Sequence, residues 1–171
     1  MVKLEPYSPV YLDATVSRIS SFFGFHQALL CEASSVKTVS ATQHEESRTT
    51  LASWLEHPSA LFVLLLDDAS VGFLRLCYRG PNVAWIEDVY VDPEFRGRGI
   101  ATCAIGLAEK RIMETPGYSA VSLDVSPRNA DALRLYHRLG YTGVSILTLR
   151  KELGENRRDK PLPMLGLDFT Y

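Results

Sequence analysis

The sequence predicts an α/β domain of the α+β class, in which helices flank a mixed, mostly antiparallel central sheet. Two stretches with helical spacing come first, three short apolar runs separated by turn residues follow, and alternating helices and strands complete the chain. Apolar residues make up 46% of the 171 residues and charged residues 22%, as in a folded protein. We expect residues 1–171 to form a single domain with its own core.

The first sixty residues predict two helices. Apolar residues recur at helical spacing from Tyr11 to Phe23, and Glu45 to Glu56 also has a helical pattern, which His57-Pro58 ends. Residues 24–43 are rich in Gly, Ser and Thr, which predicts a loop with room for a short helix. A short first strand is expected near Val2 to Leu4.

The middle of the chain predicts a three-stranded meander. The buried run Leu61–Leu66 and the run Val71–Tyr78 should form a hairpin around the turn Asp67–Ser70. Val83–Val91 is the third strand, and Asp92-Pro93 ends it because proline supplies no hydrogen-bond donor to a sheet.

The second half predicts alternating helices and strands. In order, we expect a helix over Gly97–Glu114, a strand over Ser119–Val125, a helix over Asn129–Leu139, a strand over Val144–Leu149, an exposed charged loop over Glu152–Pro163 and a strand over Leu165–Tyr171. The third strand of the meander and the strand after the first of these helices should pair in parallel through a right-handed crossover.

Composition argues against several classes of function. The formal net charge of −2 gives no electrostatic reason to expect a nucleic-acid partner. The cysteines Cys31, Cys77 and Cys103 have no CxxC spacing, and the histidines are scattered, so we expect neither a disulfide framework nor a metal site. The chain begins without the apolar run of a signal peptide and has no run long enough for a membrane span. We therefore expect a cytoplasmic protein with no membrane partner.

The segment Arg96-Gly97-Arg98-Gly99-Ile100-Ala101 predicts an anion-binding loop at the start of a helix. The first N–H groups of a helix lack intrahelical acceptors and lie at the positive end of its dipole, and glycines let the backbone approach an anion closely. No lysine follows Gly99 as a Walker A loop requires, and Thr102 stands where a dinucleotide fingerprint needs glycine. A solvated Arg/Gly turn is the alternative interpretation.

A longer stretch, Val91 to Ala101, closely resembles the acetyl-CoA motif of the GNAT N-acetyltransferase superfamily. Val71-Gly72-Phe73 matches the usual start of the third strand in that family. The second family signature is matched by Asn129, Ala132, Tyr136 and Gly140-Tyr141. The resemblance implies the GNAT fold over nearly the whole chain and is weakest over residues 1–60.

This resemblance implies acetyl-CoA as the cosubstrate and assigns its contacts. The pantetheine arm is expected along the strand backbone at Val89, Tyr90 and Val91, and Asn129 is expected to contact the cofactor. The expected pyrophosphate ligands are the amides of Arg96, Gly97, Arg98, Gly99, Ile100 and Ala101, with the hydroxyl of Thr102 as a further donor. Tyr136 would lie near the thioester sulfur and protonate the leaving thiolate, unless it is a core tyrosine of its helix.

Transfer to an amine, which is the family's reaction, needs a group that accepts a proton. An alkylammonium has a pKa of roughly 10.4, so only about one molecule in 2,500 is a free amine near pH 7. Glu87 is the predicted catalytic base, acting directly or through a water, and Asp88 is the second candidate. Strand alternation predicts that the two face opposite sides, Glu87 with Trp85 and Asp88 with Tyr90. The alternative for Glu87 is a structural acid paired with an arginine such as Arg75.

Three further features have both a functional and a structural interpretation. Cys103 could carry an acyl group, although a buried structural cysteine is the commoner case. His26 lies in the region where the family varies with substrate and could contact the acceptor. The polar stretch Ser34–Gln43 is a candidate lid, because loops often carry specificity.

The leading interpretation is an N-acetyltransferase that transfers an acetyl group from acetyl-CoA to a primary amine of a small molecule by direct attack. A protein N-terminal or lysine acetyltransferase and a non-catalytic acetyl-CoA-binding sensor are the open alternatives. A small pocket closed by residues 24–43 would favour the small molecule, and an open groove would favour a protein. A homodimer also stays open, because many relatives in the family dimerise.

Overall fold

A computed structural model describes residues 1–31, 41–56, 59–151, 153 and 160–171. The chain divides into two compact units, Met1–Asp124 and Val125–Tyr171. The prediction that residues 1–171 form one domain stays a prediction. No helix in the described part of the chain is long and apolar enough to cross a membrane.

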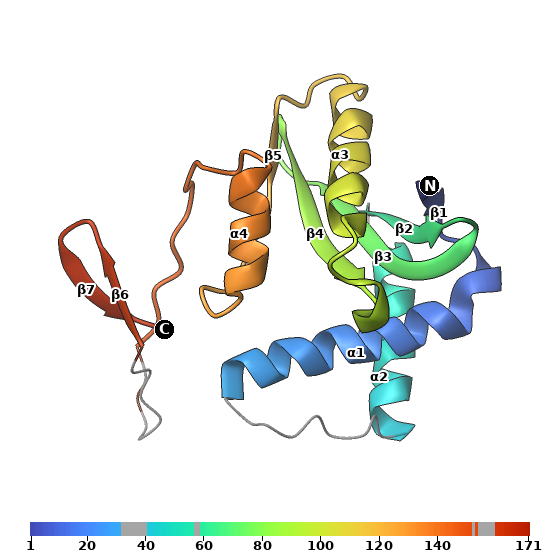
Figure 1. The fold of residues 1–171 in the computed structure, drawn as a ribbon, viewed down its shortest axis with the longest axis horizontal. Helices are drawn as coiled ribbons and strands as arrows, with labels where there is room; N and C mark the ends of the chain where they lie inside the picture. Colours follow the sequence, from blue (N-terminus) through green and yellow to red (C-terminus); the bar gives the residue numbers. More distant parts are fainter. Residues whose placement is uncertain (32–40, 57–58, 152, 154–159) are drawn as a thin grey trace. The chain divides into compact units, whose positions relative to one another are not determined.

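The first unit is built on a five-stranded sheet with the spatial order β1-β2-β3-β4-β5 (Figure 1). Its strands are β1 (Val2–Pro6), β2 (Ser59–Leu66), β3 (Ala69–Tyr78), β4 (Val83–Val91) and β5 (Ala120–Ser122). The first four strands pair antiparallel, and β5 pairs parallel to β4. These pairings confirm the predicted mixed, mostly antiparallel sheet, the short first strand and the parallel pair.

A tight turn at Asp67 and Asp68 joins β2 to β3. Both residues have positive φ angles, 49° and 67°, which is the backbone of a two-residue hairpin turn. Aspartate tolerates this left-handed region better than most residues because its short polar side chain can bond locally. The predicted turn is therefore confirmed, and it occupies the first two of the four predicted residues.

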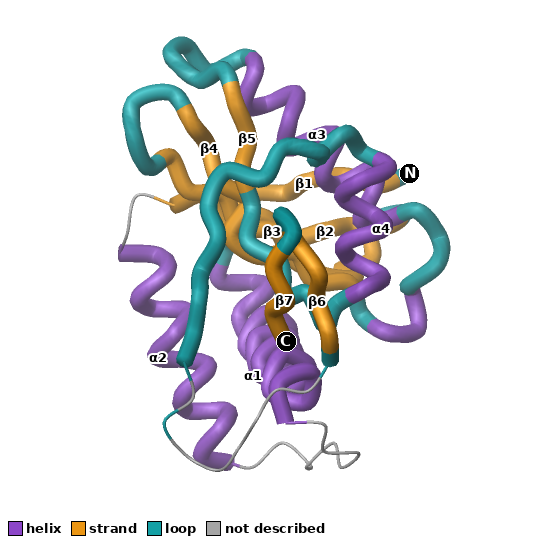
Figure 2. Tube along the Cα trace, turned by 90° about the vertical axis from the view of Figure 1, so that its left-hand side faces the viewer, coloured by secondary structure: helices purple, strands orange, loops and turns teal. Residues whose placement is uncertain are grey.

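Helices cover both faces of the sheet. α1 (Leu12–Cys31) and α2 (Ala41–Glu56) contact one face, and α3 (Ile100–Met113) contacts the other (Figures 1 and 2). Adjacent residues of β2 show the division, because Leu61 joins the core beneath α1 and α2 while the guanidinium of Arg111 in α3 lies 4.9 Å from the ring of Phe62. The short 3₁₀ helices η1 (Pro9–Tyr11) and η2 (Pro93–Phe95) precede α1 and α3.

The first long helix is longer than the sequence pattern predicts. α1 continues to Cys31, so the predicted loop is wrong over residues 24–31, and residues 32–40 of it lie outside the described residues. The extension is held by packing one turn apart, since the rings of Phe22 and His26 have centroids 4.2 Å apart. Gly24 does not break the helix, because tertiary packing overrides its low propensity.

The second unit contains α4 (Ala130–Arg138) and a two-stranded antiparallel sheet of β6 (Pro161–Met164) and β7 (Leu167–Thr170). Leu165 and Gly166, with φ angles of 54° and 75°, form the turn between the strands. The predicted strand Leu165–Tyr171 thus begins with a turn, and β6 lies where the end of an exposed loop was expected. The remainder of that loop falls largely on residues outside the described ranges.

The predicted strand Val144–Leu149 is wrong in this structure. This segment forms no regular element, and the two described strands of its unit pair only with each other. A β-branched apolar run becomes a strand only where a partner strand supplies the ladder of backbone hydrogen bonds. The sequence pattern of the run alone does not predict whether such a partner strand is present.

Candidate active site

A β-bulge in β4 brings the two candidate acids to the same face of the sheet. Arg75 of β3 is paired with Asp88, whereas the next residue, Leu76, is paired with Ile86, which leaves Glu87 as the extra residue. A bulge interrupts the period of two along a strand. The prediction that Glu87 and Asp88 face opposite sides is therefore wrong.

Two arginines hold these acids. Nε of Arg75 lies 2.6 Å from Oδ2 of Asp88, and Nη2 of the same residue lies 3.7 Å from Oε2 of Glu87. Nε of Arg79 lies 3.1 Å from Oε1 of Glu87. Two guanidinium charges thus compensate two carboxylate charges; Arg75, Glu87 and Asp88 are largely buried, whereas Arg79 is half-exposed. The pairing of Glu87 with an arginine such as Arg75, expected as the alternative to a catalytic role, is present, and the role itself stays a prediction.

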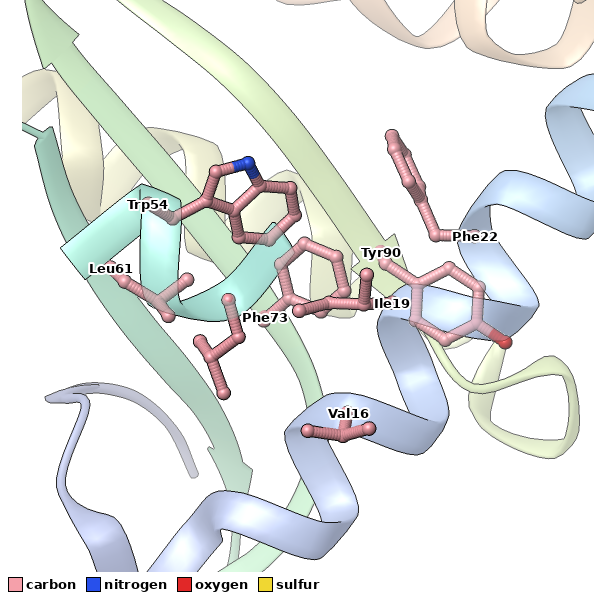
Figure 3. Close-up of a cluster of buried hydrophobic side chains, with 8 residues drawn as sticks. Val16, Ile19, Phe22, Trp54, Leu61, Phe73 and Tyr90 are labelled. Carbon is pink, nitrogen blue, oxygen red and sulfur yellow. The ribbon is translucent and has the colours of Figure 1, made fainter. Parts of the chain in front are cut away.

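Aromatic rings cover both arginines. The guanidinium of Arg75 lies 4.5 Å from the ring centre of Trp54 in α2, and that of Arg79 lies 4.0 Å from the ring centre of Trp85. Trp54 belongs to the core cluster that Figure 3 shows between α1, α2 and the sheet. The acids therefore lie on the face that α1 and α2 cover, beside a rigid aromatic wall.

The edge of β4 beyond Trp85 is not covered by β5. The parallel pairing ends where Trp85 meets Ser122, while β4 continues to Val91. The amide of Asp92 donates to the carbonyl of Val71 in β3 at 2.9 Å, so by alternation the backbone groups of Val89 and Val91 point to the opposite edge. We call this edge uncovered because no strand among the described residues pairs with it there.

Tyr90 differs from its two neighbours in the predicted set of backbone contacts. Its backbone faces β3 by the same alternation, and its side chain is buried in the core, stacked on Phe73 at a centroid distance of 5.8 Å. Of Val89, Tyr90 and Val91, only the two valines present backbone groups to the uncovered edge. Figure 3 shows the phenol ring of Tyr90 packed among the core side chains.

The Arg/Gly segment folds into a loop with two left-handed residues. Gly97 has φ 74° and Gly99 has φ 75°, a region that disfavours residues with a Cβ. No heavy atom lies within 4 Å of where a Cβ would stand on either glycine, so the loop surface is open. The glycines are thus required by backbone conformation, and they leave room beside the backbone.

Unpaired amides follow directly in the first turn of α3. Gly99 is the N-cap of this helix without a side-chain cap, and its carbonyl accepts the amide of Cys103 at 3.0 Å. The amides of Ile100, Ala101 and Thr102 precede that first bond and have no intrahelical acceptor. Together with the positive end of the helix dipole they form the anion-binding geometry that the sequence predicts.

The two arginines of this loop donate hydrogen bonds to backbone carbonyls that shortly precede it. Nε of Arg96 donates to the carbonyl of Val91 at 2.9 Å, and its guanidinium lies 5.5 Å from the ring centre of Tyr90. Nη2 of Arg98 donates to the carbonyl of Glu94 at 3.0 Å. Because each guanidinium donates one N–H group to the backbone, its positive charge stays beside the loop. The same hydrogen bond fixes the conformation of the loop.

A buried ion pair that sequence reasoning missed anchors the start of the loop. Arg18 of α1 donates three hydrogen bonds to Asp92, from Nε to Oδ1 at 2.9 Å and to Oδ2 at 3.0 Å, and from Nη2 to Oδ2 at 2.7 Å. The same guanidinium donates to the hydroxyl and the carbonyl of Ser70 at 2.7 and 2.6 Å. The available signal was a charged residue inside the apolar stripe of a helix, between Val16 and Ile19.

The other two predicted site residues lie in the second unit. Asn129 is the N-cap of α4, and its side-chain oxygen accepts the amide of Ala132 at 3.2 Å. Tyr136 lies within α4, with its ring centre 5.9 Å from that of Tyr141. Their roles toward the cofactor stay predictions.

The three further features resolve differently. Cys103 is exposed on α3, so the expectation of a buried cysteine is wrong. His26 places Nδ1 3.0 Å from the carbonyl of Phe22, within its own helix. The candidate lid Ser34–Gln43 lies mostly outside the described residues, and its last three residues begin α2.

Comparison with known proteins identifies the family. The model of the Acetyltransferase (GNAT) family matches residues 26–141, and the chain therefore belongs to that family. It is 44% identical over 64 residues to an uncharacterized N-acetyltransferase of Methanocaldococcus jannaschii, covering 35% of this chain and 26% of that protein. It is 39% identical over 67 residues to an acetyltransferase of Pectobacterium atrosepticum, covering 39% of this chain and 47% of that protein. The chain spans less than half the length of either relative.

The fold is also that of a solved acetyltransferase. The structure of AAC(6')-Iy in complex with the bisubstrate analogue CoA-S-monomethyl-acetylneamine matches with a TM-score of 0.61 and 19% identity, covering 89% of this chain and 99% of that one. This likeness confirms the predicted fold class, and the family match confirms the predicted GNAT membership.

Proposed function

We propose that this protein transfers the acetyl group of acetyl-CoA to a primary amine of a small molecule by direct attack of the amine. The observation that carries the proposal is the open loop with two left-handed glycines at the start of α3, beside the uncovered edge of β4 and within the same unit as the acid pair. Membership of the GNAT family supports the reaction. The aminoglycoside N-acetyltransferase AAC(6')-Iy supports a small amine acceptor.

The residues present fit acetyl-CoA. The amides of Ile100, Ala101 and Thr102 would hold its pyrophosphate, and the open space at Gly97 and Gly99 lets that group approach the backbone. The backbone of Val89 and the amide of Val91, whose carbonyl already accepts Nε of Arg96, would hold the pantetheine amides at the uncovered edge of β4. Acetyl-CoA supplies an acetyl group activated as a thioester.

Groups of the protein would then accept the proton of the amine and donate to the developing oxyanion and to the leaving thiolate. Glu87, held by Arg79 and Arg75, accepts the proton that the amine loses, directly or through one water. A positioned base of this kind contributes about 10²- to 10⁴-fold to the rate. The amide of Val89 is the candidate donor to the developing oxyanion. Tyr136, from the second unit, is the proposed donor of a proton to the leaving thiolate.

Thiol release from acetyl-CoA with a panel of small amines tests the proposal. We expect at least one amine to be acetylated, and Glu87→Gln to lower kcat by about 10²-fold or more while CoA binding, measured by thermal shift, is retained. Tyr136→Phe should lower kcat as well. Glu56→Gln, at the exposed end of α2, is the matched control and should leave the rate unchanged.

The same assay separates the alternatives. Thiol release with a lysine-containing peptide but with no small amine would favour a protein acetyltransferase. CoA binding without thiol release from any acceptor would favour a sensor. Failure of the wild-type protein to bind CoA would refute the cofactor assignment.

A further inference from the structure

Glu87 has charge partners, but it accepts no hydrogen bond from the residues that the structure describes. Its carboxylate lies 3.1 Å from Nε of Arg79 and 3.7 Å from Nη2 of Arg75, and both contacts are ion pairs. The neighbouring acid differs, because Asp88 accepts a hydrogen bond from Nε of Arg75 at 2.6 Å. A largely buried polar group is normally hydrogen-bonded. The oxygens of Glu87 therefore retain acceptor capacity that a ligand can use.

The two arginines beside Glu87 differ in how easily they can leave it. The side chain of Arg75 is 16% exposed, and its departure would leave Asp88 buried without a charge partner, which is strongly destabilising. The side chain of Arg79 is 49% exposed, and Glu87 is its only acid partner among the described residues. An exposed ion pair contributes little to stability. Arg79 is therefore the partner that can move away at low cost.

Arg79 lies where the proposed reaction needs access to Glu87. It directly follows the last residue of β3, and its guanidinium lies 4.0 Å from the ring centre of Trp85. Trp85 is also the last residue of β4 that pairs with β5. The uncovered edge of β4, which would hold the pantetheine arm, begins at this point. Arg79 thus occupies Oε1 of Glu87 close to the start of that edge.

The balance of charge favours an exchange of cations at Glu87. Two guanidinium groups face two carboxylates in this cluster. An added ammonium would place three cations against two anions, whereas an ammonium that replaces Arg79 keeps the charges balanced and returns the guanidinium to water. An ammonium also has three N–H donors. It can therefore supply the charge-assisted hydrogen bond that Glu87 lacks.

We propose that Arg79 is a specificity-determining residue, a displaceable counter-ion of Glu87 whose place the ammonium of the acceptor takes. The guanidinium moves from Oε1 of Glu87 into solvent, and the ammonium donates an N–H to that oxygen. Arg75 stays in place. An uncharged amine cannot replace the positive charge of Arg79, so the exchange selects charged amines. The identity of the ligand as the acceptor rests on the proposed function, whereas the exchange itself is observable without acetyl transfer.

The fluorescence of Trp85 tests the exchange directly, because the guanidinium of Arg79 covers its ring. Titration of the wild-type protein with primary alkylamines from ethylamine to butylamine, at neutral pH and constant ionic strength, should give a saturable change in emission. Methoxyamine matches ethylamine in size and is uncharged at neutral pH, so it should give none. The change should also be lost in Arg79→Gln and in Trp85→Phe, which keeps Trp54 as the other tryptophan.

Steady-state kinetics tests the consequence for the acceptor. With an amine that the wild type acetylates, Arg79→Gln should lower KM for the amine about 2- to 5-fold, because the competing cation is gone. It should leave kcat within about 2-fold, a split that a merely structural role would not give. Arg79→Lys keeps the competing charge and should retain the wild-type KM. Arg48→Gln is the matched control, since it removes a half-exposed arginine paired with Asp13 and should not change KM.

Each result supports or overturns the exchange. No emission change with any alkylamine, an equal change in Arg79→Gln, or an equal change with methoxyamine overturns it. A folded Arg79→Gln variant with a raised KM or a kcat lowered more than about 10-fold overturns it too, and would show that Arg79 positions Glu87 while acetyl transfer stands. The expected emission changes without acetylation of any amine would keep the exchange and refute the proposed function.

Discussion

Nε of Arg75 lies 2.6 Å from Oδ2 of Asp88 across the bulge of β4, and both side chains are largely buried. The same guanidinium reaches Glu87, so one side chain fixes the positions of two acids. A buried charge that loses its partner is strongly destabilising, whereas an exposed ion pair contributes little. The pair therefore sets both the stability of the bulge and the direction in which Glu87 points.

Arg75→Gln is expected to lower the free energy of unfolding by about 3–5 kcal/mol, because it leaves the carboxylate of Asp88 buried and unpaired. Urea denaturation measures the loss. The double variant Arg75→Gln/Asp88→Asn should recover part of it, since the unpaired charge is then also removed. Arg134→Gln, which breaks the exposed pair with Asp131, is the control and should cost about 1 kcal/mol or less. Equal losses of unfolding free energy in Arg75→Gln and Arg134→Gln would show that the buried pair stabilises the fold no more than the exposed pair.

The left-handed glycine ahead of α3 makes a separate prediction. Gly99→Ala places a Cβ at φ 75°, which costs about 1–2 kcal/mol, and should also weaken CoA binding because the amides of the first turn shift. Gly80→Ala is the matched control, since Gly80 has φ 87° in a turn with nothing within 4 Å of the added Cβ. Both variants should lose similar stability, but only Gly99→Ala should raise the dissociation constant for CoA. Loss of CoA binding in both would assign the effect to stability alone.

Local patterns in the sequence predicted most of the first unit. The three strands of the meander, the anion-binding loop and α3 each follow from a few neighbouring residues, and the structure places them within three residues of the prediction. Features that depend on partners distant in sequence were missed. The bulge at Glu87 depends on the register between β3 and β4, and the anchoring of Asp92 by Arg18 joins residues 74 positions apart. Val144–Leu149 has the composition of a strand, and no strand among the described residues pairs with it.

The buried contact between Arg18 and Asp92 should position the cofactor loop, because Asp92 directly precedes it. Arg18→Gln is expected to lower stability by about 3–5 kcal/mol and to raise KM for acetyl-CoA more than it lowers kcat. Arg18→Lys keeps the charge and should restore part of both. Steady-state kinetics under conditions where the variants are folded separates the two parameters.

Arg48→Gln provides the comparison for this pair. Arg48 also links α1 to a neighbouring element, but it lies 3.9 Å from Asp13 and both side chains are exposed. Its loss should cost about 1 kcal/mol or less and leave KM for acetyl-CoA unchanged. An unchanged KM in Arg18→Gln, despite the lost stability, would reduce Arg18 to a purely structural residue.

The close approach of β3 to β4 at Gly72 gives the last prediction. A Cβ on Gly72 would stand well inside van der Waals contact with the carbonyl oxygen of Tyr90 and 3.1 Å from Cδ1 of Leu64, so Gly72→Ala has to displace backbone. We expect a loss of about 1–3 kcal/mol in the free energy of unfolding. The shift should also displace β4 beside Val89 and Val91, and so weaken CoA binding. Gly106→Ala, exposed in α3 with nothing within 4 Å, should instead gain about 0.5–1 kcal/mol from helix propensity and leave CoA binding intact. Wild-type stability of Gly72→Ala would contradict this prediction, because it would show that β3 and β4 can accommodate the added Cβ at no cost.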